Sequence, residues 1–215
     1  MRTKLLIAVM ILAGLTLSLG CAGTQAPTSS VAPGQVKLLD EYADHSFNPK
    51  AYIQGMQAAG HHLYLWKSPS ADLSQYSGFT FDDFMTRHLP KLNEKQKATF
   101  SYTTYAKKVA NTLKNSLTVR DNAGSSTLIL KGAVVECNPG SRAARYLVGF
   151  GAGKSAGAVA CEVYEPGKTD PVIRLYARDT GSAGAFGGDS VAMLNHIFEQ
   201  VSLRVSSALE TRIGQ

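Results

Sequence analysis

The chain has 215 residues, and its 22 Lys and Arg against 16 Asp and Glu give a formal net charge of +6 at pH 7. This length is enough for one domain with a hydrophobic core behind a leader segment. The positive charge is small and scattered, and no recognition motif accompanies it, so we expect no nucleic-acid partner.

The first twenty-one residues have the pattern of a bacterial lipoprotein signal peptide. Two basic residues precede an apolar run from Leu5 to Leu19, and Gly20 stands directly before Cys21. We therefore expect export, removal of residues 1–20, and attachment of acyl chains such as palmitate to Cys21. The pattern departs from the usual lipobox at Ser18, where Leu is common. An apolar run of about fifteen residues is short for a transmembrane helix, which needs ~20, so a single-span anchor and an ordinary secreted protein are the weaker alternatives.

Residues 21–36 predict a flexible lipidated tether, because small and polar residues dominate them and no apolar periodicity appears. Ala22 after the cysteine leaves the outer membrane, facing the periplasm, as the default destination. We expect residues 37–213 to form a single α/β domain. Several acyl chains would hold this domain to the membrane far more firmly than one chain could.

The first half of the domain has a mixed pattern. Residues 37–60 predict loops and a short helix, residues 62–66 a short strand, and residues 79–82 a second strand. Asn93 can cap a helix that runs to about Leu117, with Gln96 in a capping-box position. Residues at helical spacing predict its buried stripe: Phe100, Thr103, Ala106, Ala110, Leu113 and Leu117.

The second half alternates more clearly. Residues 127–136 predict a central strand, and residues 158–164 and 172–177 predict a hairpin around a polar turn. Asp189 or Ser190 can cap a final helix to about Arg212. The order β-β-α-β-β-β-α favours an α+β fold with two helices packed on one face of a mainly antiparallel sheet. The apolar stripe of the final helix is Val191, Leu194, Phe198, Val201, Val205 and Leu209.

Cys137 and Cys161 lie in two predicted strands that flank a glycine-rich connection. If these strands pair around a turn near Gly149, the two cysteines would lie opposite each other, and the oxidising periplasm permits a disulfide. Two small buried side chains are the equally weighted alternative. A bridge requires Cα atoms within ~7 Å of each other.

The glycine-rich connection contains two patterns that are similar to catalytic or phosphate-binding motifs. Lys154 and Ser155 end it like a phosphate-binding loop, but Val148 stands where that motif needs glycine. Gly-Lys-Ser-Ala-Gly around Ser155 also fits the spacing of a hydrolase nucleophile, although that motif requires a helix to follow and we expect a strand. A serine hydrolase is therefore the alternative function. Arg142 and Arg145 are candidate contacts for an anionic group, or simply surface residues.

The five histidines are scattered, and no Cys or His spacing matches a zinc site, so we expect neither a metal nor another cofactor. His61 and His62 would point to opposite faces if they lay in a strand. This arrangement would keep the pair from sharing one metal ion.

Three phrases of the sequence together resemble the DUF4410 family of bacterial lipoproteins, whose function is uncharacterised. They are residues 72–76 (Asp-Leu-Ser-Gln-Tyr), the stretch from Gly140 to Gly153, and the glycine-rich residues 184–188. The order of elements is also similar to that of small α/β periplasmic domains such as the amino-terminal domain of TolB, a likeness that says little about function. The resemblance brings no catalytic residues. The lipid anchor, the flexible tether and the absence of a catalytic motif instead lead us to expect a non-enzymatic envelope lipoprotein, an accessory or assembly factor that binds an envelope protein or cell-wall component, or that forms a homo-oligomer.

Overall fold

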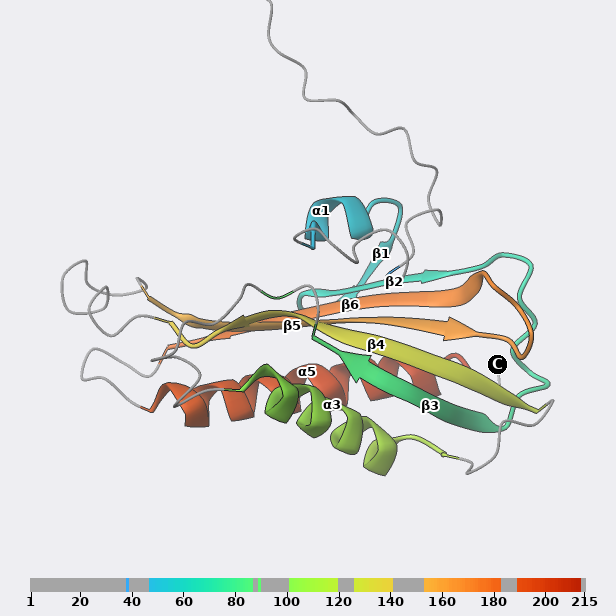
Figure 1. The fold of residues 1–215 in the computed structure, drawn as a ribbon. Helices are drawn as coiled ribbons and strands as arrows, with labels where there is room; N and C mark the ends of the chain where they lie inside the picture. Colours follow the sequence, from blue (N-terminus) through green and yellow to red (C-terminus); the bar gives the residue numbers. More distant parts are fainter. Residues whose placement is uncertain are drawn as a thin grey trace, which may run out of the picture. The chain divides into compact units, whose positions relative to one another are not determined.

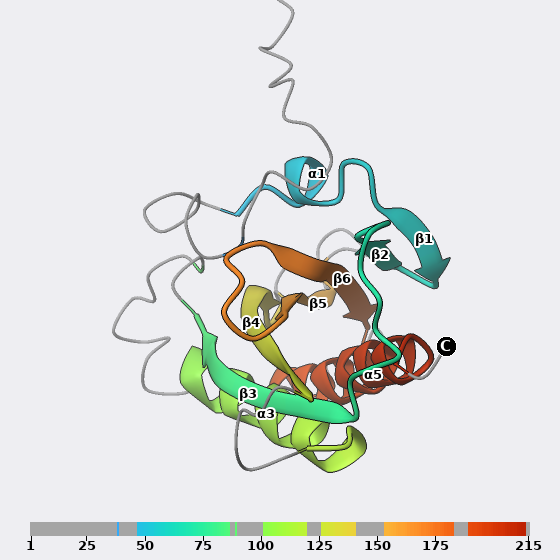
Figure 2. The same ribbon diagram turned by 90° about the vertical axis from the view of Figure 1, so that its right-hand side faces the viewer.

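The computed structural model describes residues 38, 47–86, 89, 101–119, 126–140, 153–182 and 189–213. The chain divides into two compact units, residues 1–30 and 31–215, and every described residue belongs to the second. In this unit one sheet of six strands lies between two helices on one face and a short helix on the other (Figures 1 and 2). None of the helices described is both long and apolar enough to cross a membrane.

The strands are ordered β1-β2-β6-β5-β4-β3, and all neighbours are antiparallel except the parallel pair β3 and β4. This confirms the predicted α+β class and the mainly antiparallel sheet. Two elements precede the predicted order, a short helix and the edge strand β1. The bounds are α1 Pro49–Tyr52, β1 Gln57–Gly60, β2 Leu63–Lys67, β3 Gly78–Met85, α3 Tyr102–Ser116, β4 Thr127–Asn138, β5 Ser155–Tyr164, β6 Pro171–Gly181 and α5 Ser190–Glu210.

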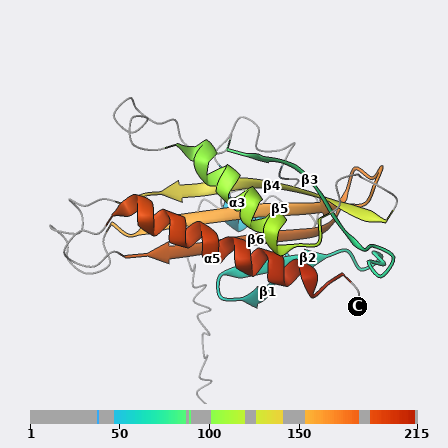
Figure 3. The ribbon, with the colours of Figure 1, turned by 90° about the horizontal axis from the view of Figure 1, so that it is seen from below.

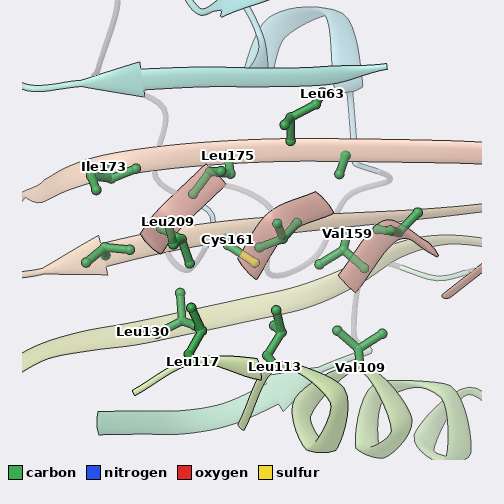
Figure 4. Packing of buried hydrophobic residues seen from close by; sticks show 14 of the residues in the cluster. Leu63, Val109, Leu113, Leu117, Leu130, Val159, Cys161, Ile173, Leu175 and Leu209 are labelled. Atoms are coloured by element: carbon green, nitrogen blue, oxygen red, sulfur yellow. The ribbon is translucent and has the colours of Figure 1, made fainter. Parts of the chain in front are cut away.

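The main core lies between the sheet and the helices α3 and α5 (Figures 1 and 3). Successive strand residues point to opposite faces, so alternate residues of the central strands enter this core. Figure 4 shows side chains of β5 and β6 converging with those of α3 between the two layers. The labelled residues from these elements are Val109, Leu113, Val159, Cys161, Ile173 and Leu175.

A second, smaller core covers the opposite face of the sheet. It contains Leu38 and Tyr52 above Ala158, Ala160 and other small side chains of the central strands. Tyr52 of α1 donates a hydrogen bond from its hydroxyl to the carbonyl oxygen of Cys161, at 3.2 Å. Because both faces are covered, every residue of β5 is buried, and this explains why its sequence is rich in alanine and valine.

Helix α3 begins at Tyr102, later than predicted. Ser101 has extended backbone angles, which ends any helix that would run on from Asn93; the predicted cap itself lies outside the described residues. The buried stripe also differs from the prediction, because Thr103 is exposed and Ala110 only half-buried. Tyr105, Ala106, Val109 and Leu113 form the stripe instead.

Helix α5 is capped by Asp189, as predicted, whose carboxylate accepts a hydrogen bond from the amide of Val191 at 2.8 Å. The predicted stripe is buried except for Val191, which is 40% exposed. Met193 already packs at the end of β6 against Gly181, so Val191 lies beyond the paired strands. Ile197 is buried in the stripe although the sequence pattern did not include it.

The start of the glycine-rich connection requires glycine at Gly140. Gly140 has a φ of +75°, and a Cβ there would overlap the carbonyl oxygen of Gly153. We expect Gly140→Ala to lower the free energy of unfolding by about 2–4 kcal/mol, from left-handed strain plus overlap. Gly167→Ala is the matched control, because Gly167 has a φ of +74° with open space around it. Urea denaturation of both variants should show the larger loss for Gly140→Ala, and equal losses would contradict this account.

Candidate functional site

A row of polar side chains crosses the face of the sheet that carries the smaller core. The strand registers place Trp66 opposite Arg174, Arg174 opposite Glu162, and Glu162 opposite Lys131. Lys131 in turn pairs with Asp82 of the edge strand β3, at 3.4 Å. We call these five residues the polar row. Its charges alternate in sign from strand to strand, so each charged side chain lies beside an opposite charge.

Glu162 is the centre of the polar row and is completely buried. One carboxylate oxygen accepts a hydrogen bond from the backbone amide of Leu38 at 2.8 Å. The other accepts from the hydroxyl of Tyr164 at 2.6 Å. The Arg174 guanidinium supplies a positive charge 3.6 Å away, which is an ion-pair distance but too long for a hydrogen bond.

Arg174 is only 2% exposed and is incompletely satisfied. Its Nε and Nη2 atoms have no hydrogen-bond partner within the described structure. The guanidinium lies over the ring of Trp66, 5.9 Å from the centroid, where the ring attracts the cation. Burial of such a group without a full set of partners costs free energy. The Glu162 carboxylate is therefore essential to Arg174, and the two form one unit.

The other end of the polar row is open to solvent. Lys131 and Asp82 have exposed side-chain fractions of 29% and 55%, and the Lys131 ammonium lies 5.2 Å from the centre of the Tyr164 ring. An ion pair in this setting contributes little to stability. The polar row thus runs from the buried Glu162–Arg174 pair on β5 and β6 to the more exposed Lys131–Asp82 pair on β4 and β3.

The polar row has one evident structural consequence, which is to hold the chain at Leu38. The Leu38 side chain is completely buried in the smaller core, and its amide donates to Glu162, 124 positions away. A buried amide that found no acceptor would cost about 1–3 kcal/mol. Glu162 therefore fixes the point at which the amino-terminal segment meets the sheet.

A second ion pair lies on the same face, toward the other end of the strands. Arg178 donates from Nε and Nη2 to the two carboxylate oxygens of Glu136, at 2.7 and 2.9 Å. Ala158 lies between their strand positions, and its small side chain leaves room for the contact. The hydrogen bonds that Arg178 donates to Glu136 raise the pKa of the Arg178 guanidinium. This geometry is bidentate, so the pair forms a rigid connection between β4 and β6 across β5.

The nucleophile arrangement considered for Ser155 does not occur. Ser155 is the first residue of β5, so a strand follows it rather than the helix that the hydrolase motif requires. Its side chain is buried, and its hydroxyl donates to the carbonyl oxygen of Pro139 at 2.9 Å. The same strand also follows Lys154, as the sequence predicted when it disfavoured a phosphate-binding loop.

The two cysteines do not lie opposite each other, so the structure agrees with the second alternative that the sequence left open, two buried side chains. β4 and β5 do pair antiparallel, but the register places Cys137 opposite Gly157 and Cys161 opposite Gly132. Both are buried free thiols, so the structure contains no bridge between them. The register of the two strands therefore keeps the two side chains apart.

Both thiols should be chemically inert in the folded protein. Burial, with a smaller contribution from the neighbouring glutamate, raises the pKa of each thiol, and the thiolate is the reactive form. In a Cys21→Ser variant, we expect Cys137 and Cys161 to react with Ellman's reagent at pH 8 on the order of a hundredfold more slowly than free cysteine. Addition of guanidinium chloride should release two thiols per chain. Rapid reaction of either thiol without denaturant would show that its strand opens readily.

The histidine pair differs from the expectation. His61 and His62 lie in the turn between β1 and β2, not in a strand, and their rings are 4.2 Å apart. His62 has a φ of +49°, which such a tight turn requires. Among the residues that the structure describes, no three His, Cys, Asp or Glu side chains are grouped to hold a metal ion.

Three sequence-predicted site residues, Cys21, Arg142 and Arg145, lie outside the described residues. Conversely, sequence reasoning missed Glu162 and Arg174. The signal for them was present, because each is a single charge inside an apolar strand pattern of the predicted hairpin. The phrase from Asp72 to Tyr76 proves structural: Leu73 and Tyr76 enter the main core, and Asp72 accepts hydrogen bonds from the amide and hydroxyl of Ser74.

Comparison with known proteins gives one family match. The family model of a domain of unknown function, DUF4410, matches residues 54–195, which confirms the resemblance noted in the sequence. No curated protein matched the chain.

Solved structures give weaker matches. Two PelC dodecamer structures from Paraburkholderia phytofirmans are 16% and 14% identical over 67% of this chain, and cover 97% and 96% of their own chains with TM-scores of 0.36 and 0.37. A candidate lipoprotein from Caulobacter crescentus CB15 is 13% identical over 51% of this chain and 80% of its own, with a TM-score of 0.35. Scores of this size do not establish a shared fold.

Proposed function

We propose, since the chain belongs to the DUF4410 family, that it is a cell-envelope lipoprotein without catalytic activity. It is held by acyl chains on Cys21, most simply in the outer membrane and facing the periplasm. Its domain acts as an accessory or assembly factor that binds an envelope protein or a cell-wall component. The lipoprotein signal at residues 1–21 and the family membership together support this assignment.

The docking of Leu38 is the observation that carries the proposal. Seventeen positions separate Cys21 from Leu38, so the tether between them can span at most about 60 Å. Because Glu162 and the smaller core fix Leu38 on the sheet, the point at which the domain is attached lies within this distance of the lipid. A tether of this length suits a protein that presents a binding surface close to the membrane.

The chemistry of the described residues also favours a binding role. The reactive groups that the sequence singled out are used to hold the fold: the Ser155 hydroxyl bonds to a backbone carbonyl, and both thiols are buried. Glu162, the most unusual carboxylate, is engaged with Leu38, Tyr164 and Arg174. The parts of the domain that a partner could contact are the outer faces of the helices and the free edge at β1.

Crosslinking in intact cells tests the proposal. The full chain with a carboxyl-terminal tag would be crosslinked in its host, and partners recovered with a Cys21→Ser chain as the matched control. We expect one dominant envelope component that depends on Cys21. Recovery of no component above the control would contradict the accessory role, and self-crosslinks alone would indicate a homo-oligomer. A fluorophosphonate probe should not label Ser155, and labelling there would establish the hydrolase alternative.

A further inference from the structure

We infer that the free edge of the sheet at β1, together with the groove beside it, binds an extended uncharged segment of a partner protein as an added strand. This inference rests on the proposed binding role and gives it a location. We call the site the edge groove. Its walls are the turn from β1 into β2 and the second half of α5, and its volume is about 490 Å³. Figures 2 and 3 show β1 at one margin of the sheet with α5 alongside.

The backbone of β1 is the first element of the argument. Among the described residues β1 pairs with β2 alone, so it ends the sheet, and all four of its residues are exposed. Natural edge strands are usually protected by charge or proline, because unpaired amides and carbonyls invite another strand. The sequence of β1, Gln-Ala-Ala-Gly, has neither. The opposite edge, β3, follows the usual rule and carries the exposed, ion-paired Asp82.

The residues that line the edge groove are the second observation that supports the inference. Leu203 of α5 is 43% exposed and is one of two large apolar side chains exposed to this degree among the described residues. Leu63 and Ala59 line the same groove, and Gln200 and Ser207 add polar groups. Apolar lining with a few polar groups is the usual chemistry of a binding groove. Alternate side chains of a strand added to β1 would point toward this lining.

The groove is preformed by Arg204. Its guanidinium donates to the carbonyl oxygen of His61 at 2.7 Å and to the Asp179 carboxylate at 2.6 Å, and its Nε donates to Gln200 at 3.2 Å. The bonds to His61 and Asp179 tie α5 to the turn and to the end of β6, and the bond to the Gln200 carbonyl oxygen lies within α5, so little ordering is needed on binding. The Asp179 carboxylate also neutralises the positive charge of Arg204 in the groove. An uncharged segment with an apolar side chain therefore complements the groove better than a charged one.

The length of β1 decides between a segment and a second folded copy. Four residues span only about 13 Å of strand, whereas a stable interface between two folded proteins buries about 1,200–2,000 Å². Pairing of two β1 edges alone would fall short of this area. A short extended segment needs only the main-chain bonds and one or two side-chain positions in the groove.

Selection of peptides tests this inference directly. The full lipidated chain in nanodiscs would be used to select from a displayed library of random peptides, with empty nanodiscs as the counter-selection. An enriched peptide would then be titrated against wild type, Leu203→Glu, Ala59→Pro and Val191→Glu. Val191→Glu is the matched control, because Val191 is equally exposed on the same helix but outside the groove. Ala59 lies where the pairing of β1 with β2 is irregular, a position at which an edge strand tolerates proline.

We expect Leu203→Glu and Ala59→Pro each to weaken binding by about tenfold or more, and Val191→Glu to change it less than about twofold. Hydrogen exchange of the β1 amides should slow when the peptide is bound, which tests strand addition even if Ala59→Pro unfolds. Absence of enriched peptides, or binding without protection of β1, would overturn the inference. A wild-type dimer that Leu203→Glu abolishes would also overturn it, in favour of a second copy. Peptide binding without an envelope partner in cells would leave the groove standing and remove the accessory role.

Discussion

Glu162→Ala should lower the free energy of unfolding by about 3–5 kcal/mol, because it leaves the buried Arg174 guanidinium without its opposite charge. The same change removes the acceptor of the Leu38 amide and of the Tyr164 hydroxyl. Urea denaturation measures the loss. Trp66 is the only tryptophan of the chain and lies against Arg174, so its fluorescence reports on the site itself.

Asp82→Ala is the matched control for this prediction. Asp82 also pairs with a cation in the polar row, but its side chain is 55% exposed, so solvent screens the pair. We expect this variant to lose less than about 1 kcal/mol. If Glu162→Ala cost no more than Asp82→Ala, the buried pair would not have the importance that its burial suggests.

A double substitution separates the two explanations for a large loss. If Glu162→Ala is harmful because Arg174 is left unpaired, then replacing both with apolar residues should restore most of the stability. Glu162→Leu combined with Arg174→Met should therefore be more stable than either single change. A double variant as unstable as the sum of the singles would mean that the hydrogen bonds to Leu38 and Tyr164 matter more than the charge.

The elements that could be predicted from sequence are those with local signals. The hairpin of β5 and β6 was predicted because two apolar runs flank a polar turn, in which Gly167 adopts a positive φ. The cap of α5 at Asp189 was predicted because a single side chain satisfies a nearby amide. In both cases the residues that determine the element lie within a few positions of each other.

The features that were missed depend on distant contacts. β1 has no apolar alternation of its own and becomes a strand because β2 offers it a partner. The buried charge of Glu162 makes sense only with Arg174 across the hairpin and with Leu38, which is 124 positions away. The cysteine pairing failed for a related reason: a register difference of a few residues, which no local pattern specifies, separates the two side chains.

Cys21→Ser should release the protein from the membrane almost completely, if the first twenty-one residues act as proposed. Each buried methylene of an acyl chain contributes about 0.8 kcal/mol of membrane affinity, so several chains hold the domain effectively without dissociation. A serine at this position cannot carry the thioether-linked lipid. Cell fractionation followed by an alkaline wash, with labelling by a palmitate analogue, measures both attachment and modification.

Two further variants make this result specific. Cys137→Ser removes a buried thiol of the domain and should leave attachment and labelling unchanged. Ser18→Leu brings the signal closer to the usual lipobox, so processing should be equally fast or faster. Measuring both attachment and labelling of the Cys21→Ser variant also tests whether the domain itself has affinity for the membrane. If the Cys21→Ser domain stayed on the membrane without label, the domain itself would carry a membrane-binding surface, and the tether that ends at Leu38 would no longer define how far the domain can reach.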